Sequence, residues 1–309
     1  MPSAALLLLL ACSRSKAPDE TGQDTGTPYV PVTRRFETTI TAGDYTLTDM
    51  HGEAVGTVHG YHMDGQFLGP TLVATAGDTV ELTVHNQSTA PVGLHPHGVR
   101  YDKDSEGIDV LAPAGGDVTY TWEANQGPGT FFYHSHELDA DDKEYQAESG
   151  LLGVLVIRDP AEDALYAPDH MINYVMMDTY QPNTTPLPSD DPGDTGSQPQ
   201  PIENRTMVVQ EVRGDPWAAD TLEDLTSHAA LGDTVRVNIV SFGSRFHTWH
   251  IHGYTWRDLD SGETLDTVAL GPAESTHLYL SELDNPGTWM VHCHVDDHMD
   301  MMMTWLVVE

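Results

Sequence analysis

The stretches GTFFYHSH (residues 129–136) and GTWMVHCH (residues 287–294) decide the fold, because they are two versions of one strand. A second matching pair, AGDTVELTVHN (76–86) and LGDTVRVNIVS (231–241), lies upstream of them. Each member of that pair precedes a His-X-His-Gly sequence, so the motifs follow the same order in both halves. The copies are separated by roughly the length of one domain, and we infer an internal duplication of one folding unit.

Short runs of alternating apolar and polar residues surround these stretches. Examples are TVELTVHN and VTYTWEA, and each run is bounded by Gly, Pro, Asn or Asp. This alternation is typical of antiparallel strands that bury one face. No amphipathic helical pattern interrupts the runs. We therefore predict an all-β chain of two β-sandwich domains, over residues 35–160 and 161–309.

The N-terminal segment differs in composition from the rest of the chain. Residues 1–12 read MPSAALLLLLAC, an apolar run too short to span a bilayer as a helix. We expect an export signal, either of lipoprotein type with the lipid on Cys12 or an ordinary one. Residues 13–34 predict a flexible tether, and residues 181–204 predict a Pro- and Asp-rich insertion. The expected location is the periplasm or cell envelope, with an anchor at Cys12 and no membrane-spanning segment.

The charge of the chain is strongly negative. It has 48 acidic and 13 basic side chains, for a formal net charge of -35. Nucleic acid is not an expected partner, because binding phosphates needs clustered Lys and Arg. The acidic surface either attracts cationic substrates or only keeps the protein solvated.

Four His-X-His pairs are the strongest chemical signal in the sequence. Residues two apart in a strand point to the same face, so each pair can direct two imidazoles at one point. Eight imidazoles from four strands suit a cluster of several metal ions, and imidazole favours copper, zinc, iron or nickel. The pairs are His95/His97, His134/His136, His250/His252 and His292/His294.

Cys293 lies between two of these histidines, so in a strand its side chain points to the opposite face. His247 is at odd spacing from His250, and His298 and Met303 follow Cys293 by five and ten residues. Two His, one Cys and a weak Met make a blue-copper electron-transfer site. Electrons can then pass from copper through the thiolate and the peptide to the neighbouring histidines, which bind a separate cluster.

The motifs HPHG (95–98), HSH (134–136), HTWHIHG (247–253) and HCHVDDH (292–298) resemble those of the multicopper oxidases, and of two-domain laccases in particular. The resemblance covers roughly residues 35–309. It implies two tandem cupredoxin-like Greek-key domains and four copper ions per subunit, with dioxygen and a small aromatic or metal-ion electron donor as substrates. It also implies a homotrimer with copper clusters between subunits.

The resemblance assigns the ligands as follows. The type 1 copper takes His247, Cys293 and His298, with Met303 axial. The type 2 copper takes His95 and His250. The type 3 pair takes His97, His134, His136, His252, His292 and His294. Serine supplies no thiolate, so Ser135 in place of a cysteine predicts that the first domain lacks a type 1 copper. Met302 stands where the family usually has Gly, and the insertion at 181–204 is longer than we expect for the family.

Further candidates surround these motifs. Reduction of dioxygen to water needs protons, and Glu106 and Asp266 are the candidate carboxylates, unless they are surface residues. Tyr101 either lies beside the cluster as a radical carrier or is a packed core residue. Four methionines form either a soft site for cuprous ions or part of the core: Met290, Met299, Met301 and Met302.

Several functions share this pattern. The first is a laccase-like oxidase of phenols or similar donors. The second is a metallo-oxidase of Cu(I), Fe(II) or Mn(II). A copper nitrite reductase ranks lower, because it needs no eight-histidine cluster and usually has its type 1 site in the first domain, where Ser135 stands. A non-enzymatic copper scaffold also ranks low, because none of the ten expected imidazoles is missing.

Overall fold

The structure is a computed structural model, and it describes residues 29–48, 54–137, 146–181, 202–213, 220–224, 226–296, 298 and 302–309. Cys12, the predicted signal, most of the tether, most of the 181–204 insertion, Met299 and Met301 lie outside the described residues. The domain boundaries stay a prediction. Residues 31–309 form one compact unit.

Two sheets form the first sandwich. One has the strand order β2-β1-β4-β7-β6 and the other β3-β9-β8-β5. A short 3-10 helix, Lys103–Ser105, follows β6. The strands are β1 Thr33–Thr48, β2 Ala54–Met63, β3 Gly69–Thr75, β4 Thr79–Asn86, β5 His95–Pro96, β6 Arg100–Tyr101, β7 Asp117–Glu123, β8 Gly129–His134 and β9 Leu152–Arg158.

Two larger sheets and a small hairpin form the second sandwich. The large sheets have the orders β12-β11-β10-β14-β19 and β13-β21-β20-β15-β18, and β16 pairs with β17. The strands are β10 His170–Gln181, β11 Ile202–Arg213, β12 Asp220–Asp224, β13 Thr226–Ala229, β14 Val235–Phe242, β15 His247–Ile251, β16 Trp256–Arg257, β17 Thr264–Leu265, β18 Thr267–Leu270, β19 Glu274–Leu280, β20 Gly287–Cys293 and β21 Met303–Val308.

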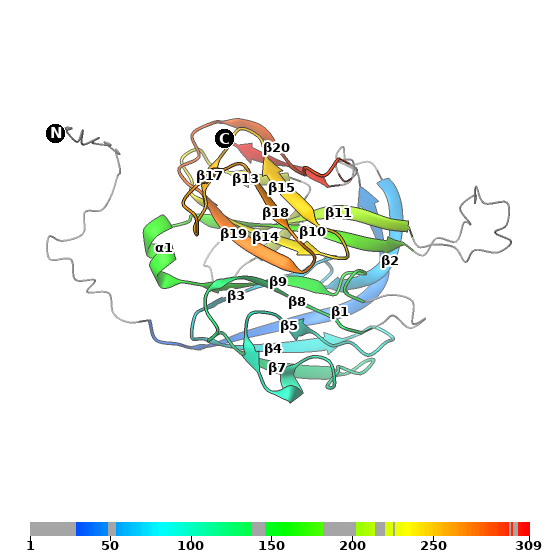
Figure 1. Ribbon diagram of the computed structural model, residues 1–309. Helices are drawn as coiled ribbons and strands as arrows, with labels where there is room; N and C mark the ends of the chain where they lie inside the picture. The colour runs from blue at the N-terminus through cyan, green and yellow to red at the C-terminus, as the bar shows by residue number, and fades with distance from the viewer. Residues whose placement is uncertain are drawn as a thin grey trace, which may run out of the picture. The chain divides into compact units, whose positions relative to one another are not determined.

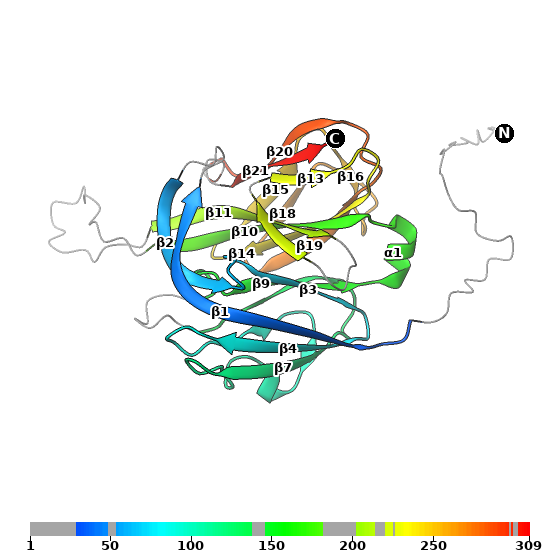
Figure 2. The same cartoon turned by 180° about the vertical axis from the view of Figure 1, so that it is seen from behind.

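The strand pairing repeats between the two sandwiches, as the internal duplication predicts. β1 runs parallel to β4, and β10 runs parallel to β14 (Figures 1 and 2). β3 runs parallel to β9, and β13 runs parallel to β21. The motif strands β8 and β20 each pair antiparallel with the strand that follows them, β9 and β21. Each motif strand therefore occupies the same place in its own sheet.

Each sandwich has its own apolar core, and the alternation seen in the sequence fills it. β4 alternates half-buried and buried side chains along TVELTVHN, and Val80, Leu82 and Val84 join the first core. The corresponding strand β14 contributes Val235 and Val237 to the second core. Alternation with period two is what a sheet with one buried face requires.

A third apolar cluster joins the two sandwiches. Phe132 of β8 and Val154 of β9 lie in it together with Val175 of β10 and Val240 of β14. The outer face of the β8–β9 pair is therefore covered by the second sandwich. This arrangement matters for function, because β8 ends at His134.

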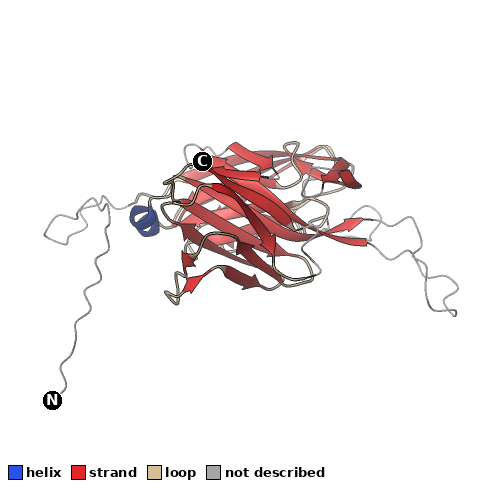
Figure 3. Ribbon diagram, turned by 90° about the horizontal axis from the view of Figure 1, so that it is seen from above, coloured by secondary structure: helices blue, strands red, loops and turns tan. Residues whose placement is uncertain are grey.

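Strands dominate the described residues (Figure 3). One short α-helix, α1 (Pro160–Tyr166), follows β9, and its first turn is capped by Asp159, whose Oδ1 accepts a hydrogen bond from the Ala161 amide at 2.8 Å. In the part of the chain that the structure describes, no helix has the length and apolar character needed to cross a bilayer.

Candidate metal centres

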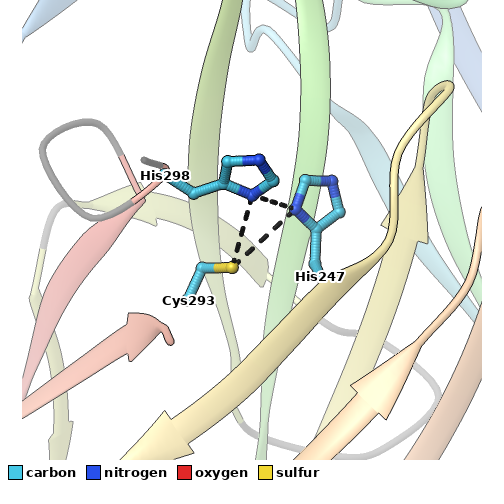
Figure 4. Close-up of side chains that lie close together, drawn as sticks. All are labelled: His247, Cys293 and His298. Atoms are coloured by element: carbon cyan, nitrogen blue, oxygen red, sulfur yellow. Dashed lines mark hydrogen bonds between the residues drawn. The ribbon is translucent and has the colours of Figure 1, made fainter. Parts of the chain in front are cut away.

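Three buried side chains converge where β15 begins and β20 ends. Cys293 Sγ lies 3.6 Å from His298 Nδ1 and 3.9 Å from His247 Nδ1, and the two Nδ1 atoms are 3.2 Å apart (Figure 4). A point equidistant from these three donor atoms would lie about 2.1 Å from each of them, close to ordinary metal–nitrogen and metal–sulfur bond lengths. The three donors therefore fit a single soft metal ion.

The fold places these donors by strand pairing. Trp249 of β15 lies opposite Cys293 of β20, so His247 and Cys293 come from neighbouring strands of one sheet. His298 follows in the turn after β20, where its amide donates to the carbonyl of Val295 at 2.9 Å. The Thr248 amide points at the sulfur, with its nitrogen 3.4 Å from Cys293 Sγ. This contact adds a hydrogen-bond donor beside a candidate sulfur ligand, and the sequence carried no signal for it.

The first histidine quartet lies at the ends of β5 and β8. Ring centroids are 5.2 Å apart for His95 and His97, 4.8 Å for His95 and His136, and 4.6 Å for His134 and His136. The Nε2 atoms of His97 and His134 approach to 3.0 Å. A cavity of about 540 Å³ opens onto all four side chains and reaches Phe242 at the end of β14. Four imidazoles therefore face one open space.

The second quartet repeats this geometry on β15 and β20. Ring centroids are 5.2 Å apart for His250 and His252, 5.3 Å for His250 and His294, and 5.1 Å for His292 and His294. The Nε2 atoms of His252 and His292 are 3.2 Å apart. One ring nitrogen from each of His250, His292 and His294 lies within 4.8 Å of the others, which suits a bound metal ion.

Backbone carbonyls orient the same two rings in each quartet. The Nδ1 atoms of His95 and His250 lie 2.8 Å and 2.7 Å from the carbonyl oxygens of Glu106 and Asp266. The Nδ1 of His134 lies 3.0 Å from the carbonyl oxygen of Ser135, and the Nδ1 of His292 lies 3.0 Å from the carbonyl oxygen of Cys293. An Nδ1–H that donates to a carbonyl leaves the Nε2 lone pair free for a metal.

A glycine follows each His-X-His of β5 and β15 for a steric reason. Gly98 and Gly253 have φ of +73° and +75°. A Cβ at Gly98 would meet Phe131 at 2.2 Å, and a Cβ at Gly253 would meet Trp289 at 2.4 Å. Glycine therefore allows the backbone after each histidine pair to adopt a positive φ and to pack against an aromatic ring.

Burial lowers the pKa of several imidazoles in the two quartets. Burial first, and then the neighbouring imidazoles, lower the pKa of His97 to about 4 and that of His134 to about 3. Burial also lowers the pKa of His292 in the second quartet. Neutral imidazole is the form that binds metals, so these ligands remain competent in mildly acidic solution.

β20 presents its two kinds of ligand on opposite faces. Cys293 has no exposed surface and belongs to the second core. His292 pairs with His250 across the strands, and His294 is exposed. The predicted separation of thiolate and imidazoles by strand parity is therefore what the structure has.

The register of β21 bears on the predicted axial ligand. Met303 lies opposite His292, so its half-buried side chain is on the face of the quartet. Met302 is fully buried in the core cluster that contains Cys293. The role of Met303 as the axial ligand stays a prediction.

Ser135 occupies the place of Cys293 in the first sandwich. Its hydroxyl donates to Gln146 Oε1 at 2.9 Å and accepts from the Glu137 amide at 3.0 Å. Both Ser135 and Gln146 are buried. A hydrogen-bonded pair therefore stands where the second sandwich has its sulfur ligand.

The candidate carboxylates contact the quartets through their backbones. The Glu106 carboxylate pairs with Lys103, and the Asp266 side chain is exposed and accepts from Thr267 Oγ1 at 3.1 Å. Sequence reasoning found these two residues but not the role of their carbonyl oxygens. A role of either carboxylate in proton transfer stays a prediction.

Tyr101 lies beside the first quartet. Its ring meets that of His95 edge-on at 5.5 Å, and it also lines a separate cavity of about 350 Å³. Burial, and then the charge of Glu106, raise its pKa. The tyrosine thus stands between a surface cavity and a candidate metal ligand, although a radical role stays a prediction.

Comparison with known proteins agrees with this geometry. Two sequence profiles described as multicopper oxidase match residues 46–162 and 196–309, and together they cover most of the chain. The chain belongs to the multicopper oxidases. As a member of this family it is a copper-dependent oxidoreductase, and the cysteine and histidine donors described above fit that metal.

This multicopper oxidase resembles larger proteins over part of their length. It is 28% identical over 239 residues to a probable nitrite reductase–hydroxylamine oxidoreductase fusion protein of Kuenenia stuttgartiensis. The aligned region covers 75% of this chain and 26% of that relative. It is 28% identical over 272 residues to the ferroxidase HEPHL1 of Homo sapiens, and the aligned region covers 77% of this chain and 22% of that relative. The chain thus spans about a quarter of the length of these relatives.

Solved structures show the same fold. A blue copper oxidase from Nitrosomonas europaea superposes with a TM-score of 0.62 at 23% identity, over 89% of this chain and 86% of that one. A copper nitrite reductase from the same organism superposes with a TM-score of 0.65 at 21% identity, over 90% and 94%. The predicted pair of cupredoxin-like sandwiches is confirmed.

Proposed function

We propose that this multicopper oxidase is laccase-like, taking single electrons from a donor and reducing dioxygen to water. The observation that carries the proposal is that strand β20 holds a buried cysteine sulfur on one face and imidazoles on the other. Bound copper supplies one-electron chemistry at the Cys293 site and dioxygen reduction at the histidine cluster.

The chain provides a short route for the electrons. Cys293 is joined through its own backbone to His292 and His294, one on each side. The Nδ1 of His292 also lies 3.0 Å from the Cys293 carbonyl oxygen, which adds a hydrogen-bonded route to the covalent one. Both routes begin at the buried sulfur and end at an imidazole of the second quartet.

We propose further that two chains complete each cluster, within a homotrimer that binds four copper ions per subunit. Every ring contact among the eight histidines, all of which the structure describes, joins members of one quartet. His136, His252 and His294 are exposed, so each quartet is open on one side.

The duplicated fold supports this assembly. The outer face of β8 and β9 is covered by the second sandwich. The corresponding face of β20 and β21 carries Met290, Trp305 and Val307, which are only half-buried in one chain. A second copy docked head-to-tail would cover this face, and such heterologous contacts close into rings. Sedimentation of the copper-loaded protein as a trimer is expected, and a monomer that retains full oxidase activity would contradict the assembly.

Two classes of electron donor compete. Phenols are the laccase-like donors, whereas a metal ion such as Fe(II) or Cu(I) is favoured by the net charge of -35 and by relatives named ferroxidase. Oxygen uptake with a phenol and with each metal ion, at equal donor concentration, separates the classes. A clear preference for the metal ions would replace the laccase-like assignment with metallo-oxidase.

Nitrite is an alternative acceptor, since a copper nitrite reductase shares the fold. The hydrogen-bonded Ser135–Gln146 pair argues against a type 1 site in the first sandwich. We expect no nitrite consumption by the reduced protein under anaerobic conditions. Nitrite turnover without oxygen uptake would contradict the oxidase proposal.

The central test is replacement of the buried thiol. In Cys293→Ser the intense blue absorption and the oxygen uptake are both expected to disappear, because serine provides no thiolate. Ser135→Ala is the matched control at the equivalent position of the first sandwich, and it should retain the blue band. Unchanged turnover in Cys293→Ser would refute the proposed function.

We also propose export to the cell envelope with a lipid on Cys12. Labelled fatty acid supplied to producing cells should appear in the wild-type protein and not in Cys12→Ala, which should be released in soluble form. Equal labelling of both proteins would contradict the anchor.

A further inference from the structure

The turn between β14 and β15 connects the two kinds of metal centre within one chain. It leaves β14 at Phe242 and enters β15 at His247, a donor of the site that contains Cys293, called the cysteine site below. Phe242, Gly243 and Ser244 line the cavity that opens onto the first quartet. His247 follows Phe242 by five residues, so this short turn has one end at each centre.

Asp178 of β10 attaches the turn to the interior of the second sandwich. Its Oδ2 accepts hydrogen bonds from the Ser244 amide at 2.8 Å and from Ser244 Oγ at 3.2 Å. The Asp178 side chain is buried, and it follows Met177, the last residue of β10 that pairs with β14. Hydrogen bonds to a carboxylate are roughly twice as strong as those between neutral groups, so this contact restrains the turn.

Gly243 allows the carboxylate to approach the turn closely. Its φ is +129°, and a Cβ at this position would lie 2.4 Å from Asp178 Oδ2. That separation is far shorter than a carbon–oxygen contact, so any side chain at Gly243 would displace the carboxylate or the turn. The glycine and the aspartate therefore form a matched pair.

The first end of the turn packs on a ligand of the first quartet. The centroid of the Phe242 ring lies 5.1 Å from that of His134, and it meets the Phe132 ring edge-on at 5.7 Å. Phe132 also contacts His134, with centroids 5.7 Å apart. Because closely packed interiors transmit displacements, a shift of Phe242 would change the position available to the His134 ring.

The second end of the turn sets the start of β15. His247 has no exposed surface, and its Nδ1 lies 3.2 Å from His298 Nδ1 and 3.9 Å from Cys293 Sγ. The three residues before it, 244–246, are exposed. Metal–donor distances are restricted to within about 0.2 Å, so a shift of the turn would change the geometry of the cysteine site as well.

We propose that Asp178 is a positioning residue for both metal centres, because it holds the turn that packs on His134 at one end and carries His247 at the other. The assignment rests on the proposed function only in that both centres bind copper. Among the described residues, Asp178 forms side-chain hydrogen bonds with Ser244 and with none of the histidines. It therefore acts through the turn and not as a ligand.

Asp178→Ala and Asp258→Ala form the first matched pair of variants. Asp258 Oδ1 accepts from the Ser261 amide and hydroxyl, both at 2.7 Å, so it makes the same contacts in the turn between β16 and β17. In the copper-loaded full chain, Asp178→Ala should shift the blue band of the cysteine site and reduce the near-ultraviolet absorption of the histidine cluster. It should also lower copper affinity by roughly 10-fold, measured against a competing chelator. Asp258→Ala should leave all three properties unchanged.

Asp178→Asn tests whether the hydrogen bonds are what matters. Its side-chain oxygen can still accept from the Ser244 amide, so the blue band and the near-ultraviolet absorption should stay close to those of the wild-type protein.

Gly243→Ala and Gly127→Ala form the second pair, which disturbs the same contact from the side of the turn. The two glycines have φ of +129° and +124°, but a Cβ at Gly127 would meet nothing within 4 Å. Backbone strain is therefore similar in both variants. Only Gly243→Ala should reproduce the spectroscopic changes of Asp178→Ala, and this pair decides the question if Asp178→Ala does not fold.

The melting temperature of every variant separates positioning from stability. A purely structural role of Asp178 would lower the melting temperature of Asp178→Ala and leave both absorption features unchanged, and that result would overturn the proposal. A change at only one of the two centres would also overturn it, and so would equal changes in the control variants.

These outcomes are separable from those of the oxidase proposal. A protein that has both absorption features but consumes no oxygen would refute the oxidase proposal, and the variants would still decide the role of Asp178. A protein that consumes oxygen, but whose absorption does not respond to Asp178→Ala, would do the reverse. A copper-loaded protein with neither absorption feature would overturn both.

Discussion

Replacement of Asn238 tests how the two sandwiches are held together. Its Oδ1 accepts hydrogen bonds from Thr130 Oγ1 at 2.6 Å and from Arg236 Nε at 3.0 Å, and its Nδ2 donates to Asn173 Oδ1 at 2.8 Å. All four residues are buried, and Thr130 belongs to β8, the strand that carries His134. Asn238→Leu preserves the volume but removes this partner from three buried polar groups.

The expected loss follows from those three groups. Each buried donor or acceptor left without its partner costs about 1–3 kcal/mol, with a charged guanidinium near the upper end. Asn238→Leu should therefore lower the free energy of unfolding by roughly 3–9 kcal/mol, a large part of the stability of an ordinary protein. Urea unfolding of the copper-free protein, followed by tryptophan fluorescence, measures the difference.

Thr83→Val is the matched control, because Thr83 makes an exposed side-chain hydrogen bond to Thr119 at 3.0 Å. Its loss should change the free energy of unfolding by less than about 0.5 kcal/mol. A loss below about 1 kcal/mol for Asn238→Leu would refute the reasoning, since the buried partners would then have found other bonds.

Three further predictions concern the quartets. In the folded protein the pKa values of His97 and His134 are about 4 and about 3, below the unfolded value of 6.5. The copper-free protein should therefore lose stability as the pH falls from 6.5 towards 4, because the unfolded state binds protons first. His134→Gln should reduce that loss, as measured by thermal melts at each pH. Gly253→Ala should lower the free energy of unfolding by about 2–4 kcal/mol, because its Cβ would meet an aromatic ring at 2.4 Å. Gly65→Ala is the control: Gly65 has a similar φ but open space around it, so the loss in urea titrations should be about 1 kcal/mol. His252→Ala should keep the blue band but lower oxygen uptake by more than about 100-fold, and unchanged uptake would argue against its role as a ligand.

The sequence predicted most of the fold because its signals are local. Alternation with period two marks strands such as β4, and the repeated motifs mark the duplication, so the two sandwiches could be inferred without coordinates. The helix α1 escaped prediction, because its seven residues are too few to show an apolar stripe. The split of ligands between the faces of β20 was also predictable, since it depends only on strand parity.

The contacts that orient the ligands were not predictable in the same way. The Thr248 amide on the sulfur and the carbonyl oxygens of Glu106 and Asp266 on the imidazoles come from backbone groups, which every residue has. No residue type marks such a contact. The Ser135–Gln146 pair joins side chains eleven residues apart, and nothing in their spacing indicates it.

The sequence by itself therefore determined which side chains can bind metal and which face of a regular strand each one takes, because both follow from residue chemistry and from the two-residue repeat. Only the tertiary structure decided that the outer face of the β8–β9 pair is covered by the second sandwich. That face packs against β10 and β14, whose residues are distant from β8 and β9 in the sequence, and strand alternation alone does not indicate which apolar faces meet.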